Sequence, residues 1–466
     1  MIKNKIHFMG IGGSGMSAAA IIAKKQGFEV DGCDELADSP YLLKVKKMGI
    51  PVSFGHDPRH IVNANVLAVS PSVLFSNKKH PEVLAGRKKT LLTWQQFTGR
   101  YLLKNKRVMC ISGTHGKSTV TTLVGFLYEK AKLDPSVIVG ANFTPWGANF
   151  HYGKSNIFIL EADEFYGNFL NYKPDTLIIN NIEYDHPDYF RDEDHVINTF
   201  RKLLNKLEGN KLLILNQDSK GINKLVKTLS KEKKDNLNIM GYTISEKPLV
   251  KLANSFTAKI VSMNSKGVKF SVKNEKTKYS HTFNLNMYGI HNVSNALGLI
   301  CLAKHDNIPD ALIEKTLRTF PGTQRRLQLI GETKSIKIYD DYAHHPTAVK
   351  ATLSAIKQKH PKERILCVFE PHTFSRTARL LVSYKDAFSD ADIVVVAPIY
   401  KSRDTKTFGV SNKSIVKVCN HNNAVAIDSF DEIKNYIIGK ARKGDVVIVM
   451  GAGKSYQLAK EVLRGK

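Results

Sequence analysis

The strongest constraint on the fold is a short apolar segment that runs into a glycine turn and then into a helix-compatible stretch. Residues 110–119 read Cys-Ile-Ser-Gly-Thr-His-Gly-Lys-Ser-Thr. Backbone N–H groups in such a turn and the positive end of the next helix face an anion, Lys117 adds a charge, and Ser118 can bind Mg²⁺. We therefore expect an α/β sheet with an ATP phosphate loop. Its residues would be Gly113, Thr114, His115, Gly116, Lys117, Ser118 and Thr119.

This loop departs from the full phosphate-loop pattern, which has a further glycine where Ile111 and Ser112 stand. The chain also contains a second Gly-Lys-Ser, at residues 453–455. A tripeptide of this kind is common by chance. The surrounding sequence must therefore decide which copy binds a nucleotide.

Length and cysteine content narrow the class of protein. A chain of 466 residues predicts about three domains. The five cysteines are widely spaced and include no C-x-x-C pair, which argues against both a disulfide framework and a zinc site. No apolar run approaches the ~20 residues of a membrane span, and glycines break the N-terminal apolar stretch too early for a signal peptide. We expect a cytoplasmic protein with reduced thiols.

The formal net charge is +27, which raises nucleic acid or an anionic membrane as a partner. The lysines are scattered, without interleaved aromatic residues or a nucleic-acid module. We interpret them as a solvated surface and expect neither a nucleic-acid nor a membrane partner, and no obligatory protein partner is evident. A positive field would still help to capture small polyanionic substrates.

Three segments alternate between strand-like and helix-like patterns, so we expect three α/β domains at residues 1–104, 105–322 and 323–466. The first domain should be Rossmann-like, because residues 10–15 form G-x-G-x-x-G between an apolar strand and a helical run. Asp31 or Asp34 would end the next strand, where a carboxylate can meet a sugar hydroxyl. The pattern alone does not distinguish NAD from a UDP-sugar.

The second and third segments both predict mainly parallel sheets. Alternating apolar residues near 268–287 suggest antiparallel strands added to the central sheet. The expected strands are 157–160, 176–180 and 212–215 in the second segment, and 336–339, 365–369, 393–396 and 446–450 in the third.

Acidic residues follow one of these strands at residues 161–164. In an open parallel sheet this places carboxylates at the ligand-binding edge, where Glu161 can complete a Mg²⁺ shell together with the loop hydroxyl. The next strand leads into residues 181–188, where His186 is suited to bind a metal or to contact the reacting phosphoryl group.

With these motifs in order, the chain resembles the Mur ligase family, and most closely its members that add L-alanine to UDP-N-acetylmuramate. The resemblance covers nearly the whole chain and rests on residues 10–17, 113–119, 161–164, 181–188, 289–295, 325–328, 340–346 and 371–377. It implies three α/β domains: Rossmann-like, phosphate-loop ATPase-like with added antiparallel strands, and Rossmann-like again. The implied partners are UDP-N-acetylmuramate, ATP and L-alanine. The implied cofactor is Mg²⁺, as two ions, or Mn²⁺ in its place.

The resemblance also implies roles for single residues. Lys117 would contact the β- and γ-phosphates and Arg326 the γ-phosphate. The metal ligands would be Ser118, Glu161 and, for a second ion, His186. The other ATP contacts would be Asn295 at adenine, His291, Asn292 and Asp341. The residues that face the UDP part would be Gly12, Gly13, Ser14, Gly15, Asp34 and Ser70. The residues around the incoming amino acid would be Tyr342, His344 and Arg376. The catalytic set would be Lys117, His186, Arg326, His344 and Arg376.

The implied reaction begins with attack of the sugar-borne carboxylate on ATP, which gives an acyl phosphate. The amine then attacks this intermediate, so water must be excluded while the third domain closes. His344 and His186 are both candidates to accept the amine proton. By the same resemblance the second Gly-Lys-Ser is a structural turn.

Some features leave alternatives open. Phe165 and Tyr166 replace the Ser-Asp typical of the alanine-adding members. Residues 180–186 and 340–342 also resemble the murein tripeptide ligase, which recycles a tripeptide onto the same nucleotide sugar, whereas residues 371–377 match the alanine-adding pattern. A nicotinamide-dependent dehydrogenase would leave the ATP loop unexplained. A basic phosphate-loop ATPase dependent on nucleic acid is a distant alternative.

Overall fold

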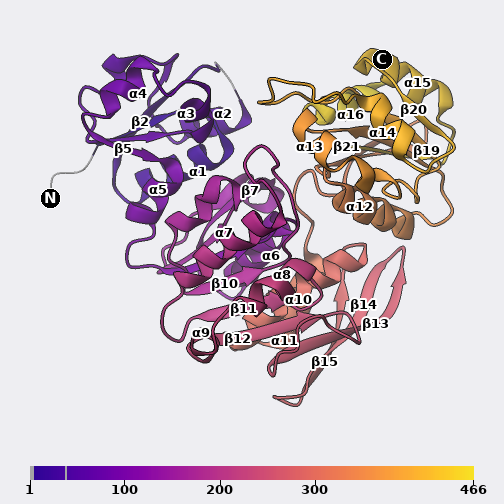
Figure 1. Cartoon of the computed structure of the whole chain (residues 1–466), viewed down its shortest axis with the longest axis horizontal. Coiled ribbons are helices and arrows are strands. Elements are labelled where there is room, and N and C mark those ends of the chain that lie inside the picture. Colours follow the sequence, from indigo (N-terminus) through magenta and orange to yellow (C-terminus); the bar gives the residue numbers. More distant parts are fainter. Residues whose placement is uncertain (1–4, 37–38, 466) are drawn as a thin grey trace.

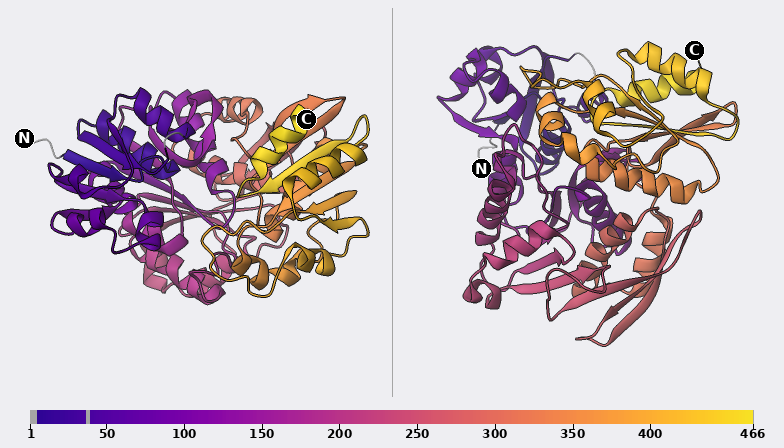
Figure 2. Two further views of the ribbon diagram at one scale, coloured as in Figure 1. Left: turned by 90° about the horizontal axis from the view of Figure 1, so that it is seen from above. Right: turned by 45° about the vertical axis from the view of Figure 1, so that its right-hand side comes forward.

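The computed structural model describes residues 5–36 and 39–465. The chain forms three lobes, each built on its own sheet. The N-terminal and C-terminal lobes lie at opposite ends of the molecule, and the central lobe lies between them and below (Figures 1 and 2). Helix α1 (Ser14–Lys25) packs on the central strand β7 (Ser136–Phe143), and α12 (Pro346–Lys359) contacts the central lobe through α10 (Ile290–His305).

The N-terminal lobe has a parallel sheet whose strand order, among the described residues, is β3-β2-β1-β4-β5. The order reverses beside β1, where open α/β sheets bind ligands. The strands are β1 (Lys5–Met9), β2 (Glu29–Asp34), β3 (Val52–Phe54), β4 (Val66–Val69) and β5 (Thr90–Thr93). Helical segments besides α1 are α2 (Pro40–Lys47), η1 (Pro58–Ile61), α3 (Pro71–Ser76), α4 (Pro81–Gly86), α5 (Trp94–Phe97) and η2 (Thr98–Leu102).

The central lobe has a larger sheet, ordered β15-β14-β13-β12-β11-β10-β6-β9-β7-β8 in the part of the chain described. Its middle strands are parallel, and β14, β15 and β8 are antiparallel to their neighbours. The strands besides β7 are β6 (Arg107–Ser112), β8 (Ala148–His151), β9 (Ile157–Glu161), β10 (Thr176–Ile179), β11 (Leu212–Asn216), β12 (Asn238–Thr243), β13 (Ser255–Asn264), β14 (Gly267–Asn274) and β15 (Tyr279–Leu285). The predicted antiparallel additions are therefore confirmed.

Helices pack on both faces of this sheet. They are α6 (Lys117–Lys130), η3 (Thr144–Trp146), η4 (Phe165–Asn171), α7 (Glu193–Asn205), α8 (Lys220–Lys227), α9 (Lys231–Asp235), α10 and α11 (Asp310–Thr319). The buried faces of α6 and α10 pack in one apolar core with strands β6, β10 and β11. This core fixes the start of α6 beside the carboxyl ends of the strands.

The C-terminal lobe is ordered β16-β17-β21-β18-β19-β20 and is parallel except for the edge strand β16, as far as the described residues extend. Its strands are β16 (Gln328–Thr333), β17 (Ile336–Asp341), β18 (Ile365–Glu370), β19 (Ile393–Val396), β20 (Ala424–Ala426) and β21 (Val446–Gly451). Its helical segments are α12, α13 (Phe374–Arg379), η5 (Leu381–Tyr384), α14 (Asn412–Val418), α15 (Phe430–Lys440) and α16 (Ser455–Arg464).

The three-domain α/β prediction is confirmed. Strand β2 begins at Glu29 and continues to Asp34, so of the two carboxylates considered Asp34 ends the strand and Asp31 lies within it. The sheets take their strands from residues 5–93, 107–285 and 328–451. The boundaries after residues 104 and 322 stay predictions.

Candidate active site

A cavity of about 1400 Å³ lies where the three lobes meet. Most of the predicted site residues line it, although they come from segments hundreds of residues apart. They are Ser14, Thr114, His115, Gly116, Lys117, Ser118, Thr119, Glu161, His186, His291, Asn292, Asn295, Arg326, Asp341, Tyr342, His344 and Arg376. Six others do not line this cavity: Gly12, Gly13, Gly15, Asp34, Ser70 and Gly113.

The phosphate loop connects β6 to α6 and has the expected strand-turn-helix form. Gly116 has φ +79°, and a Cβ there would lie 2.4 Å from the Asn295 side-chain oxygen, so only glycine fits. The His115 N–H donates to the Asn181 side-chain oxygen at 2.7 Å. These contacts hold the loop against the neighbouring strand end and leave the start of α6 facing the cavity.

Lys117 is held by a carboxylate that the sequence analysis did not single out. Its ammonium donates to the Gly113 carbonyl at 2.7 Å and to Glu164 at 2.9 Å. Burial lowers the pKa of Lys117, but the nearby carboxylates, Glu164 foremost, outweigh it and hold that pKa above its ordinary value. Burial raises the pKa of Glu164. An incoming phosphate therefore competes with Glu164 for this cation.

Oxygen ligands suited to a hard divalent cation gather beside the loop. The Ser118 hydroxyl donates to Glu161 at 3.2 Å, and the other Glu161 oxygen accepts from the Gly140 N–H at 2.7 Å. A second group, formed by Asp163, Glu164 and His186, has ligand atoms within 4.8 Å of one another. Hydroxyl and carboxylate oxygens are the donors Mg²⁺ prefers. The residues present thus fit Mg²⁺ at two neighbouring positions.

The start of α10 brings the predicted nucleotide residues beside the phosphate loop. The Asn295 amide donates to the Asn292 side-chain oxygen at 3.0 Å, and Asn292 donates to the Tyr288 carbonyl at 2.7 Å. Burial, together with the Arg326 charge, lowers the pKa of His291 to about 4. This imidazole is therefore neutral at pH 7.

The segment joining the central and C-terminal lobes is fixed by Asp341. Its carboxylate accepts from the Leu327 N–H at 2.6 Å and from the Ala343 N–H at 2.7 Å. Burial raises the pKa of Asp341, whereas Arg326 opposes this. The Arg326 guanidinium lies 5.3 Å from the Tyr342 ring centroid and lines the cavity. Asp341 thus positions the turn that carries Arg326.

Arg376 joins the C-terminal lobe to the central lobe. Its exposed fraction is 2%, and its Nε donates to Asp185 of the central lobe at 2.6 Å. It also donates to His372 at 3.0 Å and lies 3.4 Å from His186. Burial would raise the pKa of Asp185, but Arg376 outweighs it and holds that pKa well below its ordinary value. The pair is a buried ion pair between two lobes.

The two candidate proton acceptors are both neutral imidazoles near this pair. Burial lowers the pKa of His344 well below its ordinary value, and the Arg376 charge adds to this. His344 Nδ1 lies 2.9 Å from the Tyr342 carbonyl, to which it can donate, which leaves Nε2 as an acceptor. Burial also lowers the pKa of His186, whose ring packs 4.5 Å from that of Phe165.

The N-terminal glycine turn is braced by Asp34. The Gly12 N–H donates to this carboxylate at 2.7 Å. A Cβ at Gly15 would lie 2.3 Å from Trp94, so this glycine permits close packing of α1 on Trp94. Ser70 lies beside the turn as the residue before α3. Ser14 also contacts the central lobe, since Asn149 donates to its carbonyl at 2.8 Å.

The second Gly-Lys-Ser turn already holds an anion from its own chain. The N–H groups of Lys454 and Ser455 donate to the Glu370 carboxylate at 3.1 and 2.9 Å. The Lys454 side chain is exposed. Glu370 fills the place that a phosphate would take, which supports the structural interpretation of this turn.

Sequence reasoning missed several residues around the cavity. Glu164 and Asp163 were visible as part of the acidic run, and Asp185 stands next to His186, but their partners were not predictable. Tyr41 also lines the cavity, from the N-terminal lobe, and carries no sequence signal. Among the described residues, no helix is long and apolar enough to cross a membrane.

Comparison with known proteins agrees with this geometry. Three family models match in order: "Mur ligase family, catalytic domain" at residues 5–96, "Mur ligase middle domain" at 111–303, and "Mur ligase, glutamate ligase domain" at 325–453. The UDP-N-acetylmuramate–L-alanine ligase of Caldicellulosiruptor bescii is 36% identical and covers 97% of this chain and 96% of its own length. The same enzyme of Clostridium acetobutylicum is 34% identical, with coverage of 99% and 98%.

Solved structures show the same fold. The UDP-N-acetylmuramate–alanine ligase of Thermotoga maritima superposes with a TM-score of 0.79 at 24% identity and covers 99% of this chain and 98% of its own. A murein peptide ligase from Psychrobacter arcticus superposes with a TM-score of 0.70 at 22% identity and equal coverage.

Proposed function

The chain belongs to the Mur ligase family, and from this premise we propose that it joins L-alanine to the lactyl carboxylate of UDP-N-acetylmuramate at the expense of ATP. The observation that carries this proposal is the identity of 36% with an alanine-adding ligase over 97% of the chain. The reaction is a step of peptidoglycan precursor synthesis and would take place in the cytoplasm. The tripeptide ligase and the nucleic-acid-dependent ATPase are not favoured.

ATP would bind along the loop between β6 and α6. We infer that Lys117 leaves Glu164 and contacts the β- and γ-phosphates, because their negative charge exceeds that of one carboxylate. Asn295 would hold adenine, with His291 and Asn292 beside it. Arg326 would approach the γ-phosphate from the linker that Asp341 fixes.

Mg²⁺ would be held by Ser118 and Glu161, with His186 at a second position; Mn²⁺ has similar ligand preferences. When bound, these cations neutralise charge on the phosphates. Asp163 and Glu164 add carboxylates beside His186. The fit rests on the hydroxyl and carboxylate donors described above.

The UDP part of the sugar nucleotide would lie on the N-terminal glycine turn. Gly12, Gly13 and Ser14 would face the UDP part, and Gly15 lets α1 pack closely on Trp94. Asp34 braces the turn, and Ser70 lies on its other side. The sugar-borne carboxylate would then point into the cavity that Ser14 lines.

The chemistry follows in two steps. The carboxylate attacks the γ-phosphorus, giving an acyl phosphate and ADP, while Lys117 and Arg326 stabilise the transferring charge. The alanine amine then attacks the carbonyl carbon, and the tetrahedral intermediate collapses to the amide and phosphate. Tyr342 and His344 would surround the amino acid, and a neutral His344 or His186 would accept the amine proton.

Arg376 has a role in this scheme that its ion pair supports. A guanidinium engaged by Asp185 holds the C-terminal lobe against the central lobe and so excludes water from the acyl phosphate. It would also contact the alanine carboxylate with its remaining N–H groups.

The test is release of phosphate from ATP in the presence of UDP-N-acetylmuramate, with alanine, glycine, serine and the recycling tripeptide compared as acceptors. We expect alanine to give the highest kcat/KM. A higher value with the tripeptide would contradict the proposed acceptor, and phosphate release that depends on nucleic acid instead of the sugar nucleotide would contradict the reaction.

A further inference from the structure

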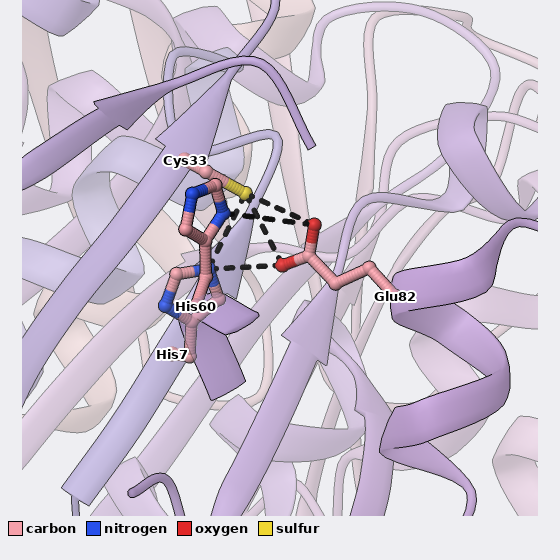
Figure 3. A group of neighbouring side chains, drawn as sticks. All are labelled: His7, Cys33, His60 and Glu82. Carbon is pink, nitrogen blue, oxygen red and sulfur yellow. Dashed lines mark hydrogen bonds and ion pairs between the residues drawn. The ribbon is translucent and has the colours of Figure 1, made fainter. Parts of the chain in front are cut away.

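A further group of side chains of the types that bind metals lies in the N-terminal lobe, outside the cavity described above. His7 comes from β1, Cys33 from β2, His60 from η1 and Glu82 from α4. His7 has an exposed fraction of 1%, and Cys33 and Glu82 have 0%. Figure 3 shows the two imidazoles and the thiol on one side, facing the Glu82 carboxylate on the other.

The ligand atoms of this group lie close enough together to share one ion, since all are within 4.8 Å of one another. His7 Nε2 lies 3.3 Å from Cys33 Sγ and 3.1 Å from Glu82 Oε1, and Cys33 Sγ lies 3.3 Å from Glu82 Oε1. His60 Nδ1 lies 3.9 Å from Glu82 Oε2. Bonds of about 2.0–2.3 Å to one zinc ion separate its ligand atoms by about 3.3–3.8 Å. We propose that these four side chains bind a structural Zn²⁺ ion.

His7 is already oriented for this role. Its Nδ1 lies 2.6 Å from Asp31, whose other oxygen lies 3.2 Å from the Lys5 ammonium. A carboxylate on one ring nitrogen keeps the proton there and presents the other nitrogen to a metal, as in carboxylate–histidine–zinc sites. Asp31, which lies within β2 and does not end it, therefore orients this histidine.

His60 supplies the observation that hydrogen bonding does not explain. Its Nδ1 is buried and, within the described part of the chain, has no hydrogen-bond partner, although it faces Glu82. Buried polar atoms without partners are uncommon in folded proteins and point to an ion or water that completes them. A metal between His60 and Glu82 would give this nitrogen a partner.

The donor set and its charge favour zinc. A thiolate and two imidazoles disfavour Mg²⁺ and Ca²⁺, and four protein ligands make a closed site. A thiolate and Glu82 together carry two negative charges, which one divalent cation balances. Cysteine spacing did not reveal this site, because its ligands come from four separate segments.

The site also has a consequence for the sugar nucleotide, and this consequence rests on the proposed function. The Cys33 carbonyl accepts from the N–H groups of Gly10 and Ile11 at 2.8 and 3.1 Å, and Asp34 follows Cys33 directly. A metal on Cys33 would hold the end of β2 and thereby the glycine turn. Removing it should raise KM for UDP-N-acetylmuramate and leave KM for ATP unchanged.

Binding itself is tested without any substrate. The full-length protein is freed of metal by a chelator and titrated with Co²⁺ alone. We expect one equivalent to produce a thiolate-to-cobalt charge-transfer band and the visible bands of a tetrahedral site, both abolished by Zn²⁺. Cys33→Ser should lose the charge-transfer band, and Cys419→Ser, which changes another buried cysteine, should keep it.

His60→Ala serves as a second variant, because its ring is partly exposed and its loss should spare the fold. Its affinity for Co²⁺ should fall at least tenfold, whereas His281→Ala in β15 should bind as the unmodified protein does. The inference is overturned if the unmodified protein gives no charge-transfer band, if the band survives in Cys33→Ser, or if His60→Ala binds unchanged. These outcomes do not depend on the ligase reaction.

Discussion

Replacing each of the two Gly-Lys-Ser lysines by alanine gives a matched test of the nucleotide site, because both follow a parallel strand and begin a helix. Lys117 lines the cavity with a side chain that is 12% exposed, and its ammonium lies 2.7 Å from the Gly113 carbonyl and 2.9 Å from Glu164. Lys454 is exposed, and its turn is filled by Glu370.

The two substitutions should reduce activity by amounts that differ by orders of magnitude. Removing one preorganised cation that faces a transferring phosphoryl group costs about 3–4 kcal/mol, or roughly 10²–10³ in kcat. We expect Lys117→Ala to lose that much or more, because ATP binding weakens as well. Lys454→Ala touches no substrate in this scheme, so its kcat/KM should stay within about twofold of the unmodified value, as for ordinary surface substitutions.

The assay is phosphate release with ATP, UDP-N-acetylmuramate and alanine, combined with calorimetric titration of ATP. Lys117→Ala leaves Glu164 without its cation, so the thermal midpoint of each variant is measured to exclude loss of fold. Lys117→Met keeps the volume of the side chain and should show the same kinetic loss. Equal damage from Lys117→Ala and Lys454→Ala, or a Lys117→Ala enzyme within tenfold of normal, would refute the assignment of the loop.

Three other outcomes follow from the structure. Gly15→Ala forces a Cβ to 2.3 Å from Trp94 and should lower the free energy of unfolding, measured by denaturant titration, by about 1–3 kcal/mol. Gly13→Ala, whose nearest neighbour is 3.5 Å away, should change this free energy by less than about 0.5 kcal/mol. Equal effects of the two substitutions would contradict the packing argument. Arg376→Ala leaves the buried Asp185 charge without a partner and should lower the free energy of unfolding by about 3–5 kcal/mol. Adding Asp185→Asn should recover much of this loss. Purely additive losses would mean that the two groups do not interact. Both candidate proton-accepting imidazoles have lowered pKa values and stay neutral as pH falls past 6.5. With every substrate saturating, neither should therefore give an acid limb of kcat above pH 6.5, and a limb above pH 6.5 that shifts when His186 or His344 is replaced would contradict this.

Much of the fold was predictable because its signals are local. A buried strand, a glycine turn and a helix start are encoded within about ten residues, so the loop at Gly116 and the turn at Gly15 could be placed from the sequence. The antiparallel strands of the central lobe were visible in the alternation of apolar residues around Phe270 and Phe283. Strand ends were less certain: β2 continues to Asp34 because its last residues are buried.

The candidate site was predictable in its residue types and less so in its partners. Ser118 and Glu161 were predicted to share a cation, and they lie within hydrogen-bond distance. The capture of Lys117 by Glu164 could not be predicted, because the sequence does not tell which of the three acidic residues at positions 161–164 reaches this lysine. Tyr41 has no pattern around it that predicts a position at the cavity.

The sequence by itself determined the local modules, since a phosphate loop or a Rossmann turn follows from short-range sterics, helix polarity and glycine placement. Only the tertiary structure decided which distant groups meet. It placed Arg376 on Asp185, closed the second lysine turn with Glu370, and gathered His7 and Cys33 with ligands from two further segments. Such contacts depend on how whole sheets pack, and side-chain charge and burial then set the pKa values on which the chemistry depends.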